Sequence, residues 1–194
     1  PMDDWHIDAM ISGSQKAFML PTGLSFIALS ESAQQRMHTS DLPRFYFDLK
    51  QEYKAYENGQ TYFSSAISLI RALEVILPEI SGPNMGKYMA RCRALMNFTR
   101  KVCKAYGLTL YSQNPGPSLT AVNVPDGIDG VHLRTMIEDA YNVTFMGGQD
   151  QLKGKIIRIV HLGHITDEDI KQGLISLGSA LRDMGYPLST DTIQ

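Results

Sequence analysis

Hydrophobic and polar positions along the first 82 residues predict two short strands followed by three helices. The strands are apolar runs, too short for helices, on either side of a stretch of small polar residues. In the third helix apolar side chains recur at i, i+3, i+4 and i+7, and Pro78 with Ser81-Gly82-Pro83 ends the helix. The predicted elements are buried strands at residues 7–11 and 24–30 and helices at residues 31–37, 50–58 and 66–77.

The remaining residues alternate helices with short strands. An apolar stripe of helical period leads from Asn84 to Tyr106, and Thr166 with three acidic residues after it marks the start of the last helix. A small sheet covered by helices follows from this order. The predicted elements are helices at residues 84–106, 130–141 and 166–184 and strands at residues 108–111, 118–125, 143–146 and 155–163.

Composition sets few limits on function. The 194 residues are 43% hydrophobic and carry a net charge of −2, which gives no overall attraction to nucleic acid or anionic membranes. We find no signal peptide and no apolar run of membrane-spanning length, so we expect a cytoplasmic protein without membrane or nucleic-acid partners. Cys92 and Cys103 are eleven residues apart in one predicted helix, about 16 Å along its axis, and cannot pair with each other.

The predicted helix at residues 84–106 is basic and contains no acidic residue. Such a helix can bind nucleic acid or an anionic surface. Because the whole chain is slightly acidic, we favour a solvated face that acidic neighbours offset. The basic residues are Lys87, Arg91, Arg93, Arg100, Lys101 and Lys104.

The candidate chemistry centres on Lys16, which lies on the connection between the first two predicted strands. Its neighbours Ser12 to Gln15 are small or hydrogen-bonding, and Pro21 and Gly23 constrain the exit of the connection. A nucleophilic lysine needs partial desolvation and surroundings that lower its pKa. A solvated loop lysine is the plain alternative.

The segment Ser-Gly-Ser-Gln-Lys-Ala at residues 12–17, followed by Leu-Pro-Thr-Gly-Leu, resembles the cofactor-lysine segment of class V aminotransferases. These are fold type I enzymes that depend on pyridoxal phosphate. The motif is most similar to that of the alanine–glyoxylate and serine–glyoxylate (serine–pyruvate) aminotransferases. The resemblance runs along most of the chain. It implies that Lys16 forms a Schiff base with pyridoxal 5'-phosphate and that Gln15 contacts the cofactor phosphate.

The resemblance also implies the fold and the division of the chain. The expected class is α/β, with residues 1–82 as the C-terminal portion of the large cofactor-binding domain. Residues 83–194 would form the α+β small domain. In the family the cofactor lysine lies near mid-chain, so its position here implies the C-terminal half of a longer enzyme. That half alone is expected to be inactive.

A second segment, Gln-Thr-Tyr-Phe-Ser-Ser at residues 60–65, resembles a family loop of the form Thr-Pro-Phe-Thr-Pro. In the family this loop crosses a dimer interface to the partner's cofactor phosphate. The resemblance therefore implies Thr61 and Ser64 as hydroxyl donors and a homodimer. Tyr62 and Ser65 replace the prolines, which loosens the loop. The alternative role of Ser64 is to cap the following helix.

Arg158 interrupts an apolar strand, where a charge must face solvent, pair or meet a ligand. Residues 154–163 resemble the family pattern Gly-x-x-x-Arg-Ile-Gly-x-x-Gly, whose arginine binds the substrate α-carboxylate as a two-pronged fork. Val160 replaces the glycine after Arg-Ile and narrows or shifts the pocket. A surface ion pair is the alternative. His161 and His164 give only a weak zinc signal, and we predict no metal site.

The function implied is transfer of an amino group from a small amino acid, alanine or serine, to glyoxylate or pyruvate. Three alternatives stay open. Two are other class V enzymes: a phosphonate transaminase, or a cysteine desulfurase-like lyase, which usually has histidine rather than Gln15 before the lysine and needs a mobile cysteine. The third is a non-catalytic dimerisation module.

Overall fold

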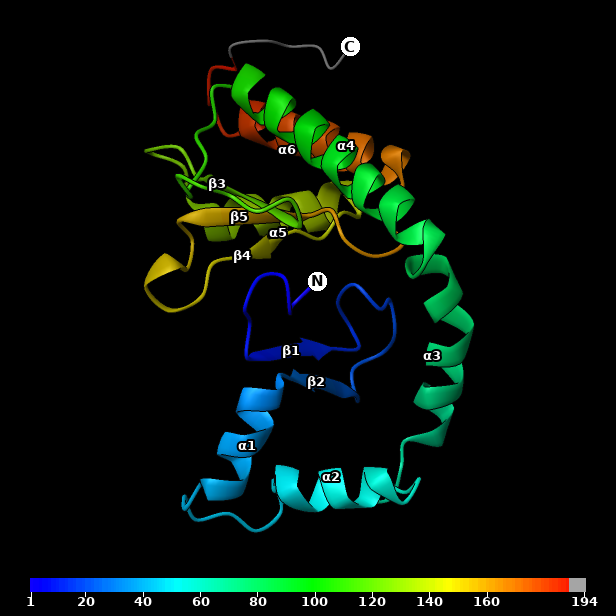
Figure 1. The fold of residues 1–194 in the computed structure, drawn as a ribbon. Coiled ribbons are helices and arrows are strands. Elements are labelled where there is room, and N and C mark those ends of the chain that lie inside the picture. Colours follow the sequence, from blue (N-terminus) through cyan, green and yellow to red (C-terminus); the bar gives the residue numbers. More distant parts are fainter. Residues whose placement is uncertain (189–194) are drawn as a thin grey trace. The chain divides into compact units, whose positions relative to one another are not determined.

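The computed structural model describes residues 1–188. Contacts divide the chain into two compact units, Pro1–Ile80 and Ser81–Gln194 (Figure 1). This division lies two residues before the predicted boundary. The assignment of the units to a large and a small domain stays a prediction.

The first unit contains one hairpin and three helices. Strands β1 (Ala9–Gly13) and β2 (Ser25–Leu29) pair antiparallel, with Ala9 opposite Leu29 and Gly13 opposite Ser25. Side-chain caps begin the first two helices: Ser30 accepts from the amide of Ala33, and Asp48 accepts from that of Lys50. The helices are α1 (Glu31–Thr39), α2 (Leu49–Glu57) and α3 (Ile67–Ile80).

Two predictions for this unit are wrong. Neither β1 nor β2 contains a buried residue, because within residues 1–80 nothing covers the two-stranded sheet closely enough to enclose either of its faces. Pro78 does not end α3 but lies within it, where the loss of one backbone donor affects only the final turn; the helix ends just before Ser81-Gly82-Pro83, the other predicted stop. Of residues 1–80, only Ser14 and Ile80 are buried.

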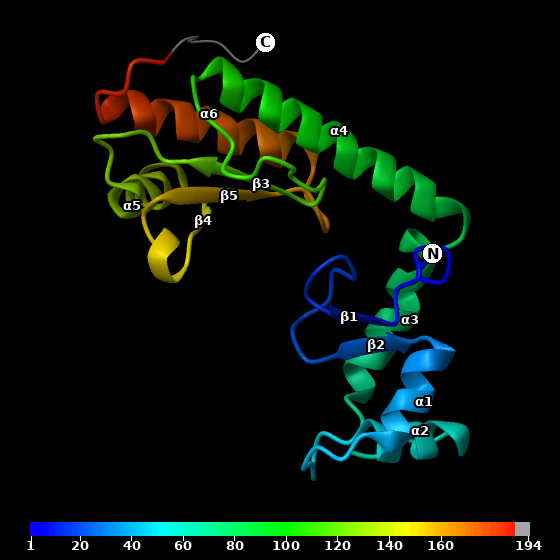
Figure 2. The ribbon, with the colours of Figure 1, turned by 60° about the vertical axis from the view of Figure 1, so that its left-hand side comes forward.

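The second unit is a two-layer arrangement of a three-stranded sheet and three helices. The strand order is β3 (Leu119–Asn123), β5 (Ile156–Val160), β4 (Met146–Gly147), and both pairs are antiparallel. Helices α4 (Pro83–Ala105) and α6 (Asp167–Asp183) lie side by side in both views, and α5 (Gly130–Tyr141) packs against α6 (Figures 1 and 2).

The core of this unit lies between the helices and one face of the sheet. From the strands it takes Val122, Ile157 and Ile159, which alternate with outward residues as a half-covered sheet requires. The predicted stripe of α4 is buried from Cys92 to Cys103, while Tyr88 at its start is half-buried, and the cysteines are free. At the start of α6, Thr166 and Asp169 form the predicted capping box.

The structure corrects the strands at the sheet edges. Predicted strand 108–111 is reduced to one bridge between Leu110 and Val122, because a loop with two prolines follows it. Strand β4 has two residues: at Gly148 an added Cβ would lie 2.1 Å from the carbonyl oxygen of Leu152, so the chain turns there into a short 3₁₀ helix, η1 (Asp150–Leu152).

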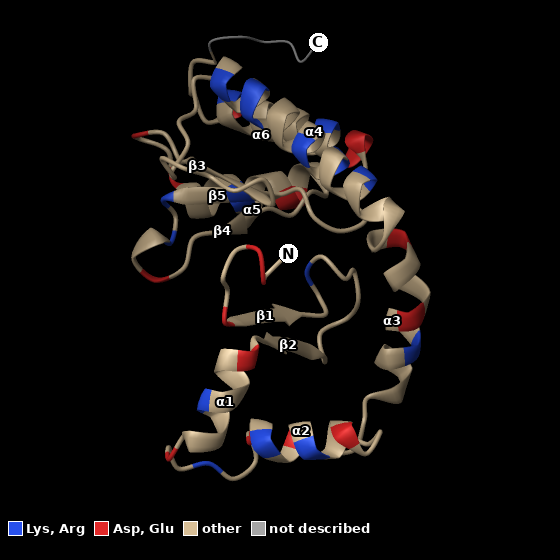
Figure 3. Cartoon of the chain, in the orientation of Figure 1, with Lys and Arg blue, Asp and Glu red and all other residues tan. Residues whose placement is uncertain are grey.

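Basic residues are spaced along α4 (Figure 3). Two of them hold loops of the same unit: the guanidinium group of Arg91 donates to the carbonyl oxygens of Gly163 and Ile165, and that of Arg100 to Gly116. Within residues 1–188, none of the helices combines the length and apolar character needed to span a bilayer.

Candidate active site

The loop that carries Lys16 is closed at its base by Ser14. The hydroxyl of Ser14 donates to the carbonyl oxygen of Pro21 at 2.7 Å and accepts from the amide of Leu24 at 3.1 Å. Its backbone amide donates to the oxygen of Leu24 at 3.0 Å, and its carbonyl accepts from Leu20 at 3.0 Å. Ser14 therefore joins the outgoing limb of the loop to the returning limb at three residues.

Lys16 lies in the five-residue arch, residues 15–19, between the two limbs that Ser14 joins. The lysine amide donates to Gly13 at 3.3 Å, and its carbonyl accepts from Met19 at 3.1 Å, where a positive φ of 57° reverses the chain. The residue is exposed. Gly23 passes under Leu69 of α3, because an added Cβ would lie 2.5 Å from that side chain.

Gln15 is exposed next to Lys16, and its side chain folds back over Gly13. An added Cβ on Gly13 would lie 2.6 Å from Oε1 of Gln15, so only glycine leaves room for this conformation. The amide of Gln15 and the amine of Lys16 thus belong to the same arch of the first unit.

Thr61 and Ser64 lie on the loop before α3. The hydroxyl of Thr61 lies 2.6 Å from the carbonyl oxygen of Phe63 and 2.7 Å from the hydroxyl oxygen of Ser65, so this hydroxyl stabilises the loop itself. Ser64 is exposed. Because α3 begins at Ile67, Ser64 is not its capping residue, and that alternative is wrong. The ring of Phe63 stacks on Tyr46 at 4.1 Å, which holds the loop against the segment after α1.

Arg158 belongs to the second unit and occupies the centre of its sheet. On β5 it pairs with Ala121 of β3 and Met146 of β4, on the face away from the core. Among residues 1–188 it forms no ion pair, so the surface ion-pair alternative is not observed there. Its Nε is buried, and no described residue accepts a hydrogen bond from it.

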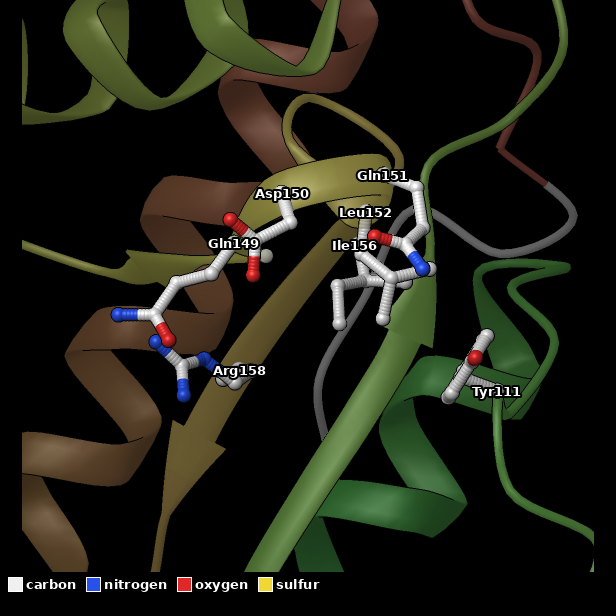
Figure 4. Close-up of a pocket in the computed structure, with 8 residues that line it drawn as sticks. Tyr111, Gln149, Asp150, Gln151, Leu152, Ile156 and Arg158 are labelled. Carbon is white, nitrogen blue, oxygen red and sulfur yellow. The ribbon is translucent and has the colours of Figure 1, made fainter.

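Two hollows meet at Arg158. The first, of about 400 Å³, has a mixed lining in which the side chains of Gln149 and Asp150 lie on the guanidinium side (Figure 4). Its lining is Tyr111, Gly148, Gln149, Asp150, Gln151, Leu152, Ile156 and Arg158. The second, of about 710 Å³, lies between the α5–β4 loop, β5 and the start of α6. The guanidinium group thus has open space for an anion, although Asp150 lines the first hollow and Asp169 the second.

Behind the strand of Arg158, a buried polar cluster faces the helices. Nε2 of His161 lies 2.8 Å from the hydroxyl of Thr120, which also accepts from Nε of Arg100 at 3.3 Å. Burial, together with the nearby charge of Arg100, lowers the pKa of His161 to about 4, so the imidazole is neutral at pH 7. In the described part of the chain, no three His, Cys, Asp or Glu side chains gather as a metal site.

The predicted site residues fall into two groups. Lys16, Gln15, Thr61 and Ser64 lie in the first unit, and Arg158 lies in the second. Sequence interpretation missed the part that Ser14 takes in closing the arch. It also missed the hollow beside Arg158, for which the pair Gly147-Gly148 before a polar loop was the available signal.

Comparison with known proteins gives relatives over almost the whole chain. No protein-family model matches. The chain is 36% identical to a soluble hydrogenase small subunit of Synechococcus sp. (strain PCC 6716), covering 96% of this chain and 49% of that one. It is 32% identical to a serine–glyoxylate aminotransferase of Arabidopsis thaliana, covering 96% of this chain and 48% of the relative.

A solved aspartate aminotransferase from Thermus thermophilus matches with a TM-score of 0.82 and 28% identity, over 94% of this chain and 51% of that one. The chain spans about half the length of the relatives it matches. The predicted resemblance and the predicted fold class are confirmed. In sequence and in fold, this chain is thus similar to about one half of each aminotransferase described above.

Proposed function

We propose that the whole protein is an aminotransferase dependent on pyridoxal phosphate, with Lys16 as its catalytic lysine. The observation that carries the proposal is the arch of residues 15–19, closed by Ser14, which presents an exposed primary amine. A lysine presented on a fixed backbone suits covalent work on a carbonyl group.

The groups of the first unit fit such a cofactor by their chemistry. Lys16 supplies an amine for the aldehyde, and Gln15 supplies amide N–H donors for a phosphate. Ser64 adds an exposed hydroxyl. Thr61 contributes its hydroxyl after exchanging its present partners, Phe63 and Ser65. We infer that Thr61 and Ser64 serve the phosphate of a partner subunit in a homodimer.

In the mechanism that we propose, Lys16 and Arg158 have separate tasks. Arg158 binds the substrate α-carboxylate through two parallel N–H groups, which orients the amino acid. Nζ of Lys16 takes the proton from the substrate α-carbon and returns it to the cofactor side. When bound, pyridoxal phosphate supplies the aldehyde that exchanges amines and the ring that accepts the electron pair.

We propose a small amino acid, alanine or serine, as donor and glyoxylate or pyruvate as acceptor, with the cytoplasm as location. The serine–glyoxylate aminotransferase among the relatives supports this choice. Another relative is named as a hydrogenase subunit, and we do not extend that name to this chain. A desulfurase-like lyase is disfavoured, because Cys92 and Cys103 are buried in α4 and burial raises the pKa of Cys103 to about 12.

The test is transamination by the whole protein with pyridoxal phosphate, alanine or serine, and glyoxylate. Lys16→Ala should abolish turnover, and Lys101→Ala, which changes an exposed lysine of α4, should leave it unchanged. Near-normal turnover of Lys16→Ala would refute the proposed role of Lys16.

A further inference from the structure

Ser14 is the most enclosed polar side chain of the first unit. Its exposed fraction is 0%, whereas Lys16 and Gln15 next to it are exposed. Only Ile80 is also buried among residues 1–80. In a unit that buries so little, a completely enclosed hydroxyl needs partners, because a buried polar group without them is costly.

Those partners all lie on the returning limb of the lysine loop. A serine hydroxyl has one donor and acceptor lone pairs, and Ser14 uses both functions, donating to Pro21 and accepting from Leu24. Two backbone bonds, to Leu20 and Leu24, run beside them. The hydroxyl thus cross-links the loop near the point where it returns to β2.

The consequence falls on the five residues between the limbs. Residues 15–19 form an arch whose ends are fixed, and Lys16 is its second residue. The lysine side chain is a flexible four-carbon stem, so the backbone that bears it fixes the point from which the amine reaches the reacting carbon. A displacement of about 1 Å in a reacting group can lower a rate by roughly a hundredfold.

We propose that Ser14 is a positioning residue for Lys16. By closing the arch, its hydroxyl holds the backbone of Lys16 in place and so fixes the point from which the lysine amine reaches the reacting carbon. The proposal rests on the proposed function, because it assigns Ser14 a task in the reaction of Lys16. Ser14 touches neither cofactor nor substrate in this scheme.

The test compares Ser14→Ala with Ser12→Ala in the whole protein loaded with pyridoxal phosphate. Ser12 lies two residues earlier on β1, and the described residues give its hydroxyl no hydrogen bond, so the control makes the same chemical change without removing the cross-link. Substrate affinity is assigned to Arg158 and not to the arch, so kcat and KM should respond differently.

For Ser14→Ala we expect the cofactor still attached to Lys16, kcat lower by at least about tenfold, and KM for the amino acid changed less than about threefold. Hydrogen exchange at the Leu24 amide should accelerate by at least about fivefold, because the Ser14 hydroxyl is the acceptor of that amide in the described residues. Ser12→Ala should match the unaltered protein in every measurement. Unchanged kcat and unchanged Leu24 exchange in Ser14→Ala would overturn the proposal.

The unaltered protein provides a second measurement if Ser14→Ala does not fold. Its Leu20 and Leu24 amides should exchange more slowly than those of Thr22 and Gly23, which have no partner among residues 1–188. Equal exchange at the four amides would overturn the closed arch. Failure of the proposed function looks different, because the unaltered protein would then take up no cofactor on Lys16.

Discussion

Nε2 of His161 lies 2.8 Å from the hydroxyl oxygen of Thr120, and both side chains are completely buried in the second unit. The folded pKa of His161, about 4, lies below the ordinary value of 6.5. Between these values the unfolded chain binds more protons than the folded one, so the free energy of unfolding falls as the pH is lowered through this window. Above pH 6.5 this histidine has no such effect.

The loss expected from His161 by pH 4 is on the order of 3 kcal/mol. Thermal melting between pH 7 and pH 4 checks it. His161→Gln can keep a bond to Thr120 without titrating, so its melting temperature should fall less steeply, whereas His132→Gln, a change of an exposed histidine, should follow the unaltered protein. Equal slopes for His161→Gln and the unaltered protein would show that His161 does not contribute.

Replacing Arg158 should weaken substrate binding. Arg158→Gln removes a charged fork, whose hydrogen bonds to a carboxylate are worth about 1.5–3 kcal/mol, so KM for the amino acid should rise about 10- to 100-fold. Arg158→Lys keeps the charge without the fork and should lie in between. Steady-state kinetics measure this. Arg93→Gln, which changes an exposed arginine of α4, is the control, and an unchanged KM in Arg158→Gln would remove the carboxylate role.

Asp150 lines the same hollow as Arg158 and opposes a bound carboxylate by its negative charge (Figure 4). Asp150→Asn should therefore lower KM for the amino acid by about two- to fivefold at low ionic strength. The effect should shrink in high salt, because exposed charges are screened. A higher KM in Asp150→Asn would mean instead that this carboxylate helps to hold the substrate, for example at its ammonium group.

Two glycines of the second unit should respond oppositely to alanine. At Gly130 an added Cβ would lie 2.1 Å from the oxygen of Gly154 and 2.8 Å from Val124, so Gly130→Ala should destabilise the protein by at least about 2 kcal/mol. Gly86 lies in α4 with nothing within 4 Å, so Gly86→Ala should stabilise it by about 0.5–1 kcal/mol. Urea midpoints measure both, and a shift of the same sign would contradict this packing.

Local signals predicted the helices well. The period of α4 and the Thr166–Asp169 capping box are properties of nearby residues, and both are observed. The exposure of β1 and β2 was not predictable in this way, because an apolar run shows that a strand can be buried but not whether other residues cover it. The end of β4 also depends on a contact outside the strand, the close approach of Gly148 to Leu152.

The candidate site was predictable in its residue types and not in its support. The pattern around Lys16 placed the lysine on a connection between strands, and the structure has it there. Ser14 resembled a small spacer, because its enclosure depends on the return of the chain to Leu24, ten residues later. The hollow beside Arg158 depends on a positive φ at Asp150, a conformation unusual for a residue other than glycine.

The most direct test of the central claim is to identify the residue that holds the cofactor. The whole protein is loaded with pyridoxal phosphate, reduced with borohydride, digested and analysed by mass spectrometry. We predict that the mass of the reduced cofactor appears on the peptide containing Lys16 and is absent from Lys16→Ala. Labelling of another lysine, or an unlabelled Lys16 in a protein that catalyses transamination, would contradict the account.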